Sequence, residues 1–361
     1  MLNIISPINQ LGYGIAGLNI CKMLNQECRA SLFPIGKPEV TNKEDGEIIS
    51  DMINRSVFFD YNAPAIKIWH QHDMSSFVGR GTRIGFPIFE LDSFTDVEQH
   101  SLSSLDKILV CSSWAKSIIL KEIDIKEEDV HVVPLGVDKS IFKSQGLPTQ
   151  ENSPTVFFNC GKWEVRKGHD ILINAFNMAF NQEDNVELWM MCENPFYTPS
   201  EQGEWESLYE NSPIGADKIK ILKRVETQAE VYNIMSYADC GVFPSRAEGW
   251  NLELLEMMAC GKPVITTNYS AHTEFCTKEN SMLVSIDELE MAYDGKWFDG
   301  KVGSWASLGD KQIEEICSHM RTIHSQKQNG TLKQNLAGIE TARSFGWANT
   351  SKKIVEVLEN V

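Results

Sequence analysis

The stretch that decides the fold reads PSRAEGWNLELLEMMACGKPVI, from Pro244 to Ile265. Its beginning predicts the end of a strand, after which Glu248 falls in a loop. The next residues have helical spacing, carry Glu256 eight positions after Glu248, and end at Gly261. The start of such a helix offers free backbone N–H groups and a positive dipole end, which suit a phosphate. The stretch therefore predicts two glutamates on either side of an anion site.

The composition indicates a globular protein of about two domains. The chain has 361 residues, of which 42% are hydrophobic, and no apolar run approaches the ~18 residues of a membrane span. Nine cysteines without a Cys-x-x-Cys pair favour reduced thiols, so we expect a cytoplasmic protein with no zinc site and no transmembrane segment. The net charge of −17 makes nucleic acid an unexpected partner, although composition does not exclude it.

A second stretch, NCGKWEVRKGHD from Asn159 to Asp170, gathers three cations in six residues. It follows an expected strand and opens an expected helix. Lys162, Arg166 and Lys167 fit a diphosphate, because charge develops on such a leaving group in the transition state. A solvated surface loop is the simpler alternative, since charge clusters are usually solvated.

Short apolar strands alternate with helical patterns along the whole chain, which predicts parallel βαβ units. A polar stretch at 145–154 is the expected interdomain linker. The expected strands are 3–5, 65–69, 84–89, 107–111, 131–134, 155–159, 187–192, 218–222 and 240–244, and the expected helices are 11–24, 113–121, 167–180, 227–238 and 347–358.

The first expected strand leads into a glycine loop, QLGYGIAG from Gln10 to Gly17. Its G-x-G-x-x-G spacing is that of a dinucleotide fingerprint, which favours a nicotinamide-dependent oxidoreductase, but the motif is weak alone. A plain tight turn is the other interpretation.

Polar side chains follow two further strands of the first half. His70 and His72 come after the strand at 65–69, and Glu90 comes after the strand that begins at Ile84. Ligands bind open α/β sheets at the carboxyl ends of their strands, but loops are also polar by default. A metal site at His70 and His72 lacks a third ligand at suitable spacing.

In order and spacing, the two long motifs resemble those of retaining, GT-B fold glycosyltransferases of family 4 (glycosyl transferases group 1). Three further segments extend the resemblance over roughly 107–272: the "S-x-W" of 110–116, the "P-x-G-V-D…F" of 133–142, and the lead into the glutamate loop at 237–245. The chain departs from the family at Lys162, where arginine is usual, and at Asn251, where glycine is usual.

The resemblance implies an α/β fold of two Rossmann-like, doubly wound domains that face a cleft. Residues 1–148, joined by the C-terminal helix at 345–361, would bind the acceptor. Residues 149–344 would bind a nucleotide sugar.

The resemblance also implies roles for single residues. Glu248 would position the donor sugar and Glu256 would bind the ribose diol. Lys162, Arg166 and Lys167 would bind the leaving diphosphate. The resemblance implies two further sets of donor contacts. One is the backbone of Gly249, Trp250, Asn251 and Leu252, and the other is the loop at Gly12 and Gly14 in the first domain. His72 or Glu90 would lie against the donor sugar, and the sequence leaves open which of the two does so.

The implied activity is a hexosyl transfer with retention, from a UDP-, GDP- or ADP-linked sugar to the hydroxyl of an unidentified acceptor. No Asp-x-Asp triplet occurs in the chain, so we expect a metal-independent enzyme without a cofactor. The alternatives are a non-catalytic nucleotide-sugar-binding module and the oxidoreductase that the Gly12–Gly17 loop favours.

Overall fold

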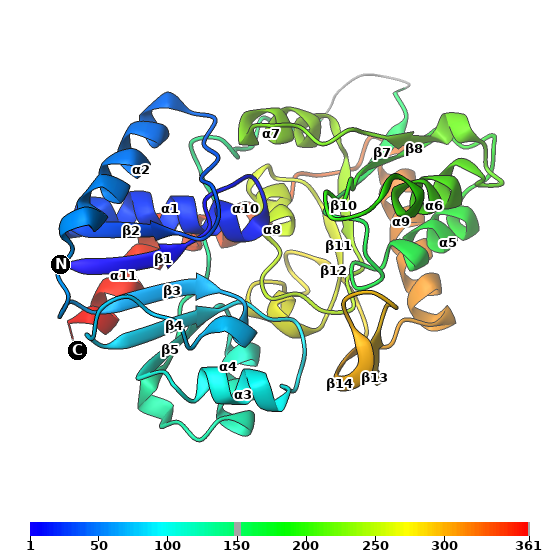
Figure 1. The fold of residues 1–361 in the computed structure, drawn as a ribbon. Coiled ribbons are helices and arrows are strands. Elements are labelled where there is room, and N and C mark those ends of the chain that lie inside the picture. Colours follow the sequence, from blue (N-terminus) through cyan, green and yellow to red (C-terminus); the bar gives the residue numbers. More distant parts are fainter. Residues whose placement is uncertain (148–152, 360–361) are drawn as a thin grey trace. The chain divides into compact units, whose positions relative to one another are not determined.

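The computed structural model describes residues 1–147 and 153–359 and divides the chain into two compact units (Figure 1). Unit 1 comprises Met1–Asp138 and Ser344–Val361, and unit 2 comprises Lys139–Arg343. The expected linker at 145–154 and the expected boundary between 148 and 149 lie partly outside the described residues. The roles assigned to the two domains stay predictions.

Unit 1 is built on a six-stranded sheet in the order β2-β1-β3-β4-β5-β6, in which every neighbouring pair is parallel. Its elements are β1 (Leu2–Ser6), α1 (Gly12–Glu27), β2 (Ala30–Pro34), α2 (Lys43–Arg55), β3 (Ala65–Trp69), β4 (Arg83–Pro87), α3 (Asp96–Leu102), β5 (Lys107–Val110), α4 (Ser113–Glu122), β6 (Val130–Val132) and α11 (Trp347–Leu358).

Unit 2 has a second six-stranded parallel sheet, in the order β12-β11-β10-β7-β8-β9, and a separate two-stranded sheet. Its elements are β7 (Thr155–Cys160), α5 (His169–Ala179), β8 (Val186–Met191), α6 (Pro199–Glu210), β9 (Ile219–Ile221), α7 (Gln228–Tyr237), β10 (Cys240–Phe243), α8 (Leu252–Ala259), β11 (Val264–Thr267), β12 (Met282–Val284), β13 (Leu289–Tyr293), β14 (Asp299–Ala306), α9 (Asp310–Gln328) and α10 (Leu336–Ser344).

The central strands of both sheets are buried on both faces. Every residue of β1 and of β10 is buried, as expected of parallel strands that are covered by helices on either side. The expected α/β fold of two doubly wound units is therefore confirmed.

The strand order reverses once in each sheet. In unit 1 the reversal lies between β1 and β3, and in unit 2 it lies between β7 and β10. The loops that follow two such strands run to opposite faces of the sheet and leave a crevice, where ligands of open α/β sheets bind. The topology therefore predicts that ligands bind at the loops after β1, β3, β7 and β10.

Helix α11 packs against α1 within unit 1 (Figure 1, red and blue). The Thr350 hydroxyl donates a hydrogen bond to the Pro134 carbonyl at 2.8 Å. At Gly136 an added Cβ would lie 2.3 Å from the backbone nitrogen of Trp347. The glycine of the "P-x-G-V-D" segment is thus explained by the close approach of the C-terminal helix.

The cysteines behave as packing residues. All nine are free, and seven of them are buried. Burial raises the pKa of the Cys21 thiol to about 12, so such a thiol is unreactive near neutral pH. Within 1–147 and 153–359, no helix is both long enough and apolar enough to cross a bilayer.

We expect Gly136→Ala to destabilise the protein, because the new methyl group meets backbone atoms that cannot move aside. Overpacking of this kind costs about 1–3 kcal/mol. Gly46→Ala is the matched control, since nothing lies within 4 Å of an added Cβ in that helix; it should be neutral or slightly stabilising. Thermal unfolding followed by circular dichroism measures both, and an equal melting temperature for the two variants would contradict the packing argument.

Candidate functional site

Two loops of unit 2 touch at its switch point. The loop at 161–168 joins β7 to α5, and the loop at 244–251 joins β10 to α8. Gly168 has φ +71°, and an added Cβ there would lie 2.0 Å from the Pro244 carbonyl oxygen. The amide of Arg246 also donates to the carbonyl of Arg166 at 2.7 Å. Only glycine permits this approach, so the loops are held together by their backbones.

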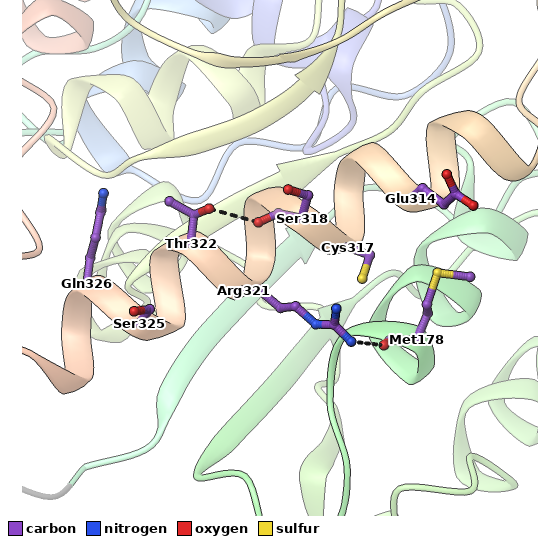
Figure 2. Close-up of a pocket in the computed structure, with 8 residues that line it drawn as sticks. All are labelled: Met178, Glu314, Cys317, Ser318, Arg321, Thr322, Ser325 and Gln326. Atoms are coloured by element: carbon purple, nitrogen blue, oxygen red, sulfur yellow. Dashed lines mark hydrogen bonds between the residues drawn. The ribbon is translucent and has the colours of Figure 1, made fainter.

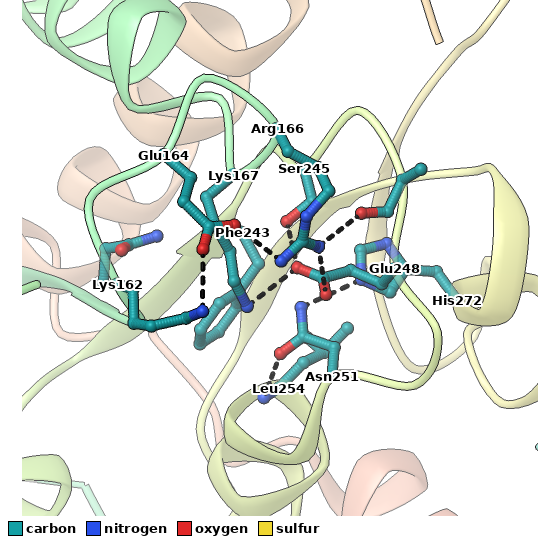
Figure 3. Close-up of polar contacts among 12 residues, drawn as sticks. Lys162, Glu164, Arg166, Lys167, Phe243, Ser245, Glu248, Asn251, Leu254 and His272 are labelled. Carbon is teal, nitrogen blue, oxygen red and sulfur yellow. Dashed lines mark hydrogen bonds and ion pairs between the residues drawn. The ribbon is translucent and has the colours of Figure 1, made fainter. Parts of the chain in front are cut away.

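Five charged side chains from these loops form one ion-pair cluster (Figure 3). Lys162 Nζ lies 2.9 Å from Glu164 Oε1, and Glu164 Oε2 lies 2.7 Å from Arg166 Nη2. Arg166 Nη1 lies 2.8 Å from Glu248 Oε2, and Lys167 Nζ lies 2.9 Å from Glu248 Oε1. The cluster joins the predicted Glu248 to all three predicted cations.

The cluster stays ionised although most of it is buried. Burial alone would raise the pKa of Glu248, but Lys167 and Arg166 outweigh this effect and hold that pKa well below its usual range. Burial would lower the pKa of Lys167, but Glu248 and then Glu253 raise it above its usual value. Buried charges persist when they are paired in this way. Three cations and two carboxylates form the cluster, and Glu253 adds a further negative charge close to Lys167.

The Glu248 carboxylate has a fixed orientation. Ser245 Oγ donates to Glu248 Oε1 at 2.7 Å, and the Glu248 amide donates to Ser270 Oγ at 2.8 Å. Arg166 also donates to the Ala247 carbonyl at 2.8 Å. These contacts favour a positioning role for the buried Arg166, and its predicted contact with a donor phosphate stays a prediction.

Asn251 begins helix α8 in the left-handed region, with φ +83°. Asparagine tolerates this region better than most residues, and its Oδ1 accepts a hydrogen bond from the Leu254 amide at 3.1 Å. The amide group of Asn251 donates to His272 Nε2 at 2.9 Å. Just before it, Trp250 is buried with its ring 4.9 Å from that of Phe275. Asparagine thus fills the position where the family usually has glycine, and its side chain also caps the helix.

The remaining predicted residues of this loop surround the helix start. Gly249 is buried and Leu252 is the first residue of α8. Glu256 is buried on the same helix. Burial raises the pKa of Cys160, and the charges of Glu253 and Glu256 add to the effect. The carboxylates of α8 therefore lie near the end of β7, where the cationic loop begins.

Two buried histidines support the site and were missed by the sequence analysis. His169 Nδ1 accepts from the Glu164 amide at 3.2 Å, and its Nε2 lies 3.0 Å from Asn159 Oδ1. His272 Nε2 accepts from Asn251, and its Nδ1 lies 3.1 Å from the Thr267 carbonyl. Each ring has one donor and one acceptor role, so both are neutral. Burial lowers the pKa of His169 to about 3 and that of His272 to about 4.

The glycine loop of unit 1 is explained mainly by packing. An added Cβ would lie 2.2 Å from Asn9 Oδ1 at Gly14 and 2.2 Å from Ser6 Oγ at Gly17. At Gly12 nothing lies within 4 Å. The spacing of Gly14 and Gly17 is therefore required by the β1–α1 turn itself and does not call for a dinucleotide. Gly12 alone leaves open space for a ligand.

An aromatic and imidazole cluster lies at the switch point of unit 1. The Tyr13 hydroxyl donates to the Ile88 carbonyl and lies 3.2 Å from His70 Nδ1, so the His70 ring donates to that hydroxyl. The ring of His72 stacks on His70 with centroids 5.4 Å apart. Glu90 lies two residues beyond Ile88 and is half-buried. Sequence reasoning missed Tyr13 and gave His70 no part in donor binding; which of His72 and Glu90 faces a donor sugar stays a prediction.

A surface pocket of unit 2 lies away from the cluster, along α9 (Figure 2). Arg321 lines it, but its guanidinium donates to the carbonyls of Ala179 and Met178 at 3.0 and 2.8 Å. It therefore caps the C-terminal end of α5. In the described part of the chain, no group of three or more His, Cys, Asp or Glu side chains is arranged to hold a metal ion.

Residues 154–294 match the protein-family model described as glycosyl transferases group 1. The matched segment contains both loops of the ion-pair cluster. This segment of the chain, 154–294, therefore resembles glycosyl transferases group 1. Mannosylfructose-phosphate synthase from Agrobacterium fabrum is 22% identical over 222 residues, which cover 56% of this chain and 49% of that protein. The chain spans about half the length of the curated relatives it matches.

Solved structures of glycosyltransferases share the fold over the whole chain. Sucrose-phosphate synthase from Thermosynechococcus elongatus superposes with a TM-score of 0.72 at 13% identity, covering 99% of this chain and 98% of that chain. HepE from Anabaena, in complex with UDP and glucose, gives 0.70 at 14% identity, covering 100% and 99%.

We expect the free energy of unfolding to fall as the pH drops from about 6.5 to about 4. The unfolded chain takes up protons on His169 and His272 in this window, whereas the folded chain excludes them, so acid favours unfolding. The shift at His272 corresponds to about 3 kcal/mol, at roughly 1.4 kcal/mol per pKa unit. His272→Asn should flatten the profile of stability against pH, measured by urea unfolding, whereas the exposed His100→Asn should not. Parallel profiles for the wild type and His272→Asn would contradict this assignment.

Proposed function

We propose that the protein transfers a sugar from a nucleotide-diphosphate donor to an acceptor hydroxyl, with retention of the anomeric configuration. The observation that carries this proposal is the ion-pair cluster at the switch point of unit 2, next to the start of α8. The resemblance of 154–294 to glycosyl transferases group 1 supports the same activity.

The donor diphosphate fits the cluster by charge. The three cations of the cluster and the N-terminal amides of α8 both favour an anion. Lys162 is the most exposed cation of the cluster, so it is best placed to meet a phosphate directly. Lys167 is more buried and would neutralise charge as the diphosphate departs. The complexes of HepE with UDP and with UDP-glucose support a nucleotide sugar as the donor class.

The two glutamates have separate tasks in this proposal. Glu248, with its orientation fixed by Arg166, Lys167 and Ser245, hydrogen-bonds hydroxyls of the donor sugar. Glu256 binds the ribose diol. The backbone amides from Gly249 to Leu252 cap the distal phosphate.

The chemical step needs no dedicated base. The bond between the anomeric carbon and the diphosphate oxygen breaks, and a bond from that carbon to the acceptor oxygen forms on the same face. The acceptor proton passes to the departing phosphate oxygen. Cationic side chains then stabilise the negative charge that this oxygen gains in the transition state.

Unit 1 would bind the acceptor group that receives the sugar in this proposal. Gly12 is the position of its glycine loop where a ligand can approach the backbone. Tyr13, His70, His72 and Glu90 supply hydrogen-bonding groups at the same switch point, and either His72 or Glu90 would lie against the donor sugar. The named relatives, a mannosylfructose-phosphate synthase and a sucrose-phosphate synthase, differ in the products they are named for, so the family does not assign the acceptor.

Thermal shift against UDP-, GDP- and ADP-sugars tests donor binding first. A rise in melting temperature with one nucleotide, without added metal and in the presence of EDTA, is the expected result. Proton NMR of the transfer product then reads its anomeric configuration, which should equal that of the donor. An inverted product, or activity that requires a divalent ion, would count against the proposed mechanism.

We expect Lys167→Ala to lower kcat by about tenfold or more, because it removes charge stabilisation that matters most in the transition state. Glu256→Gln should mainly raise the KM for the donor, because it weakens ground-state binding of the ribose. Lys220→Ala is the matched control, since Lys220 is a cation of unit 2 that pairs with Glu187 outside the cluster. Steady-state kinetics with the donor identified above measure all three. Equal changes of KM and kcat in the two site variants would refute the division of roles.

A further inference from the structure

Unit 2 carries exposed aromatic rings beside its ion-pair cluster. Phe196 follows β8 and is 53% exposed, and Trp297 lies between β13 and β14 and is 51% exposed. Their ring centroids lie 6.3 Å apart at an angle of 81°. We call Phe196, Tyr197 and Trp297 the aromatic platform. Neither resemblance to the family nor the predicted donor site assigns it a task.

The hairpin tip holds Trp297 in place. Asp294 Oδ1 accepts hydrogen bonds from the amides of Lys296, Trp297 and Phe298 at 2.9, 2.8 and 2.9 Å. Gly295 supplies the positive φ of +75° that the turn requires. An exposed indole on such a locked turn loses little entropy on binding, which is the property of a preorganised contact.

The segment of Phe196 is held just as firmly. Asn194 Oδ1 accepts from the Phe196 amide at 3.0 Å, and the Tyr197 amide donates to the Asn194 carbonyl at 3.1 Å. The side-chain amide of Asn194 donates to the Trp163 carbonyl at 3.0 Å. Trp163 lies between Lys162 and Glu164, so this bond joins the platform to the loop of the ion-pair cluster.

Lys296 contacts both segments of the platform, the one at Phe196 and Tyr197 and the one at Trp297. Its Nζ lies 4.5 Å from the Tyr197 ring centroid and 5.4 Å from that of Trp297. The same ammonium pairs with Glu201 at 2.6 Å and donates to the Phe196 carbonyl at 3.4 Å. Aromatic faces are thus bordered by a cation, a carboxylate and a carbonyl oxygen.

The platform is also joined to the ion-pair cluster by side chains. Lys162 Nζ lies 5.2 Å from the Phe196 ring centroid while it pairs with Glu164. At the base of the hairpin, Arg246 Nε lies 3.2 Å from Glu290, and the Arg246 guanidinium lies 5.9 Å from the Trp305 ring. A ligand on the platform therefore touches a surface that is rigidly connected to Glu248 and its partners.

We propose that the aromatic platform binds pyranose rings of a carbohydrate acceptor, beyond the sugar that receives the transferred unit. Exposed apolar patches rimmed by polar groups mark binding sites, and a sugar ring offers an apolar C–H face with hydroxyls at its edge. The rings of Phe196 and Trp297 match that face, while Lys296 and Glu201 match the hydroxyls. This inference rests on the proposed glycosyl transfer and narrows its acceptor to an oligosaccharide or polysaccharide.

Two other occupants fit the surface less well. A membrane surface attracts basic segments through its anionic lipids, but the chain carries a net charge of −17 and the platform pairs its own cation with Glu201. A second copy of the chain would bring a like net charge to the same face. Both remain outcomes that the experiment separates.

Ligand-observed NMR measures saccharide binding without using tryptophan as the probe. The protein is titrated with maltohexaose, isomaltohexaose, mannohexaose and cellohexaose. Stacking depends on the face of a pyranose ring more than on the linkage between rings, so the wild type should bind at least one of these hexasaccharides. Trp297→Ala should weaken that binding at least fivefold, and Trp297→Phe should restore part of it. Tyr237→Ala is the matched control, because this tyrosine of α7 is 67% exposed in unit 2, and it should leave saccharide binding as in the wild type.

Kinetics separate the platform from the donor site. With a hexasaccharide acceptor, Trp297→Ala should raise the KM for the acceptor by at least fivefold and leave the KM for the nucleotide sugar within twofold. Saccharide binding that depends on Trp297 in a protein without transferase activity would support the platform and overturn only the proposed function. This inference would be overturned if the wild type bound no saccharide, or if Trp297→Ala bound it with unchanged affinity. It would also be overturned if Trp297 were needed for dimer formation or vesicle binding but not for saccharide binding.

Discussion

The burial of the Glu248 carboxylate is the constraint on which the rest of unit 2 depends. A buried carboxylate is costly unless cations and hydrogen bonds surround it, and here Arg166 and Lys167 arrive from the other loop. The two loops must therefore touch, which requires Gly168 under the Pro244 carbonyl. The same pairing requires the strand order to reverse between β7 and β10. The ion pairs, the close backbone approach at Gly168 and the strand order therefore all belong to the contact between the two loops.

The sequence predicted those features that local pattern controls. Buried strands such as β1 and β10 stand out as apolar runs, and Gly261 marks the end of α8. Helix α5 begins two residues later than the pattern predicted, because Gly168 takes a left-handed conformation and serves as its N-cap. The family resemblance assigned Glu248 and the cations to one donor site, but their pairing was not predicted, since no local pattern reports that residues some 80 positions apart meet.

The features that were missed depend on contacts between distant segments. His272 Nδ1 contacts the nearby Thr267 carbonyl, but its Nε2 meets Asn251, which lies in another loop. Tyr13 and His70 come from different βα units and meet through the order of β1 and β3. The β13–β14 hairpin has mostly exposed residues in its first strand, so it lacks the apolar alternation by which strands are found. Each of these features depends on the residues that surround it in the folded protein, and a single sequence does not display those neighbours.

The connection between the units has a consequence for synthesis on the ribosome. Unit 1 receives its helix α11 only after the whole of unit 2 has been made, because unit 2 ends at Arg343 and α11 begins at Trp347. Domains generally fold as units in the order in which they emerge. The unit that is started second is therefore completed first, while α1 and the segment at Pro134, which follows β6, lack the helix that covers them. The surface of α1 that α11 covers in the folded protein therefore stays exposed to solvent until the end of the chain has been made.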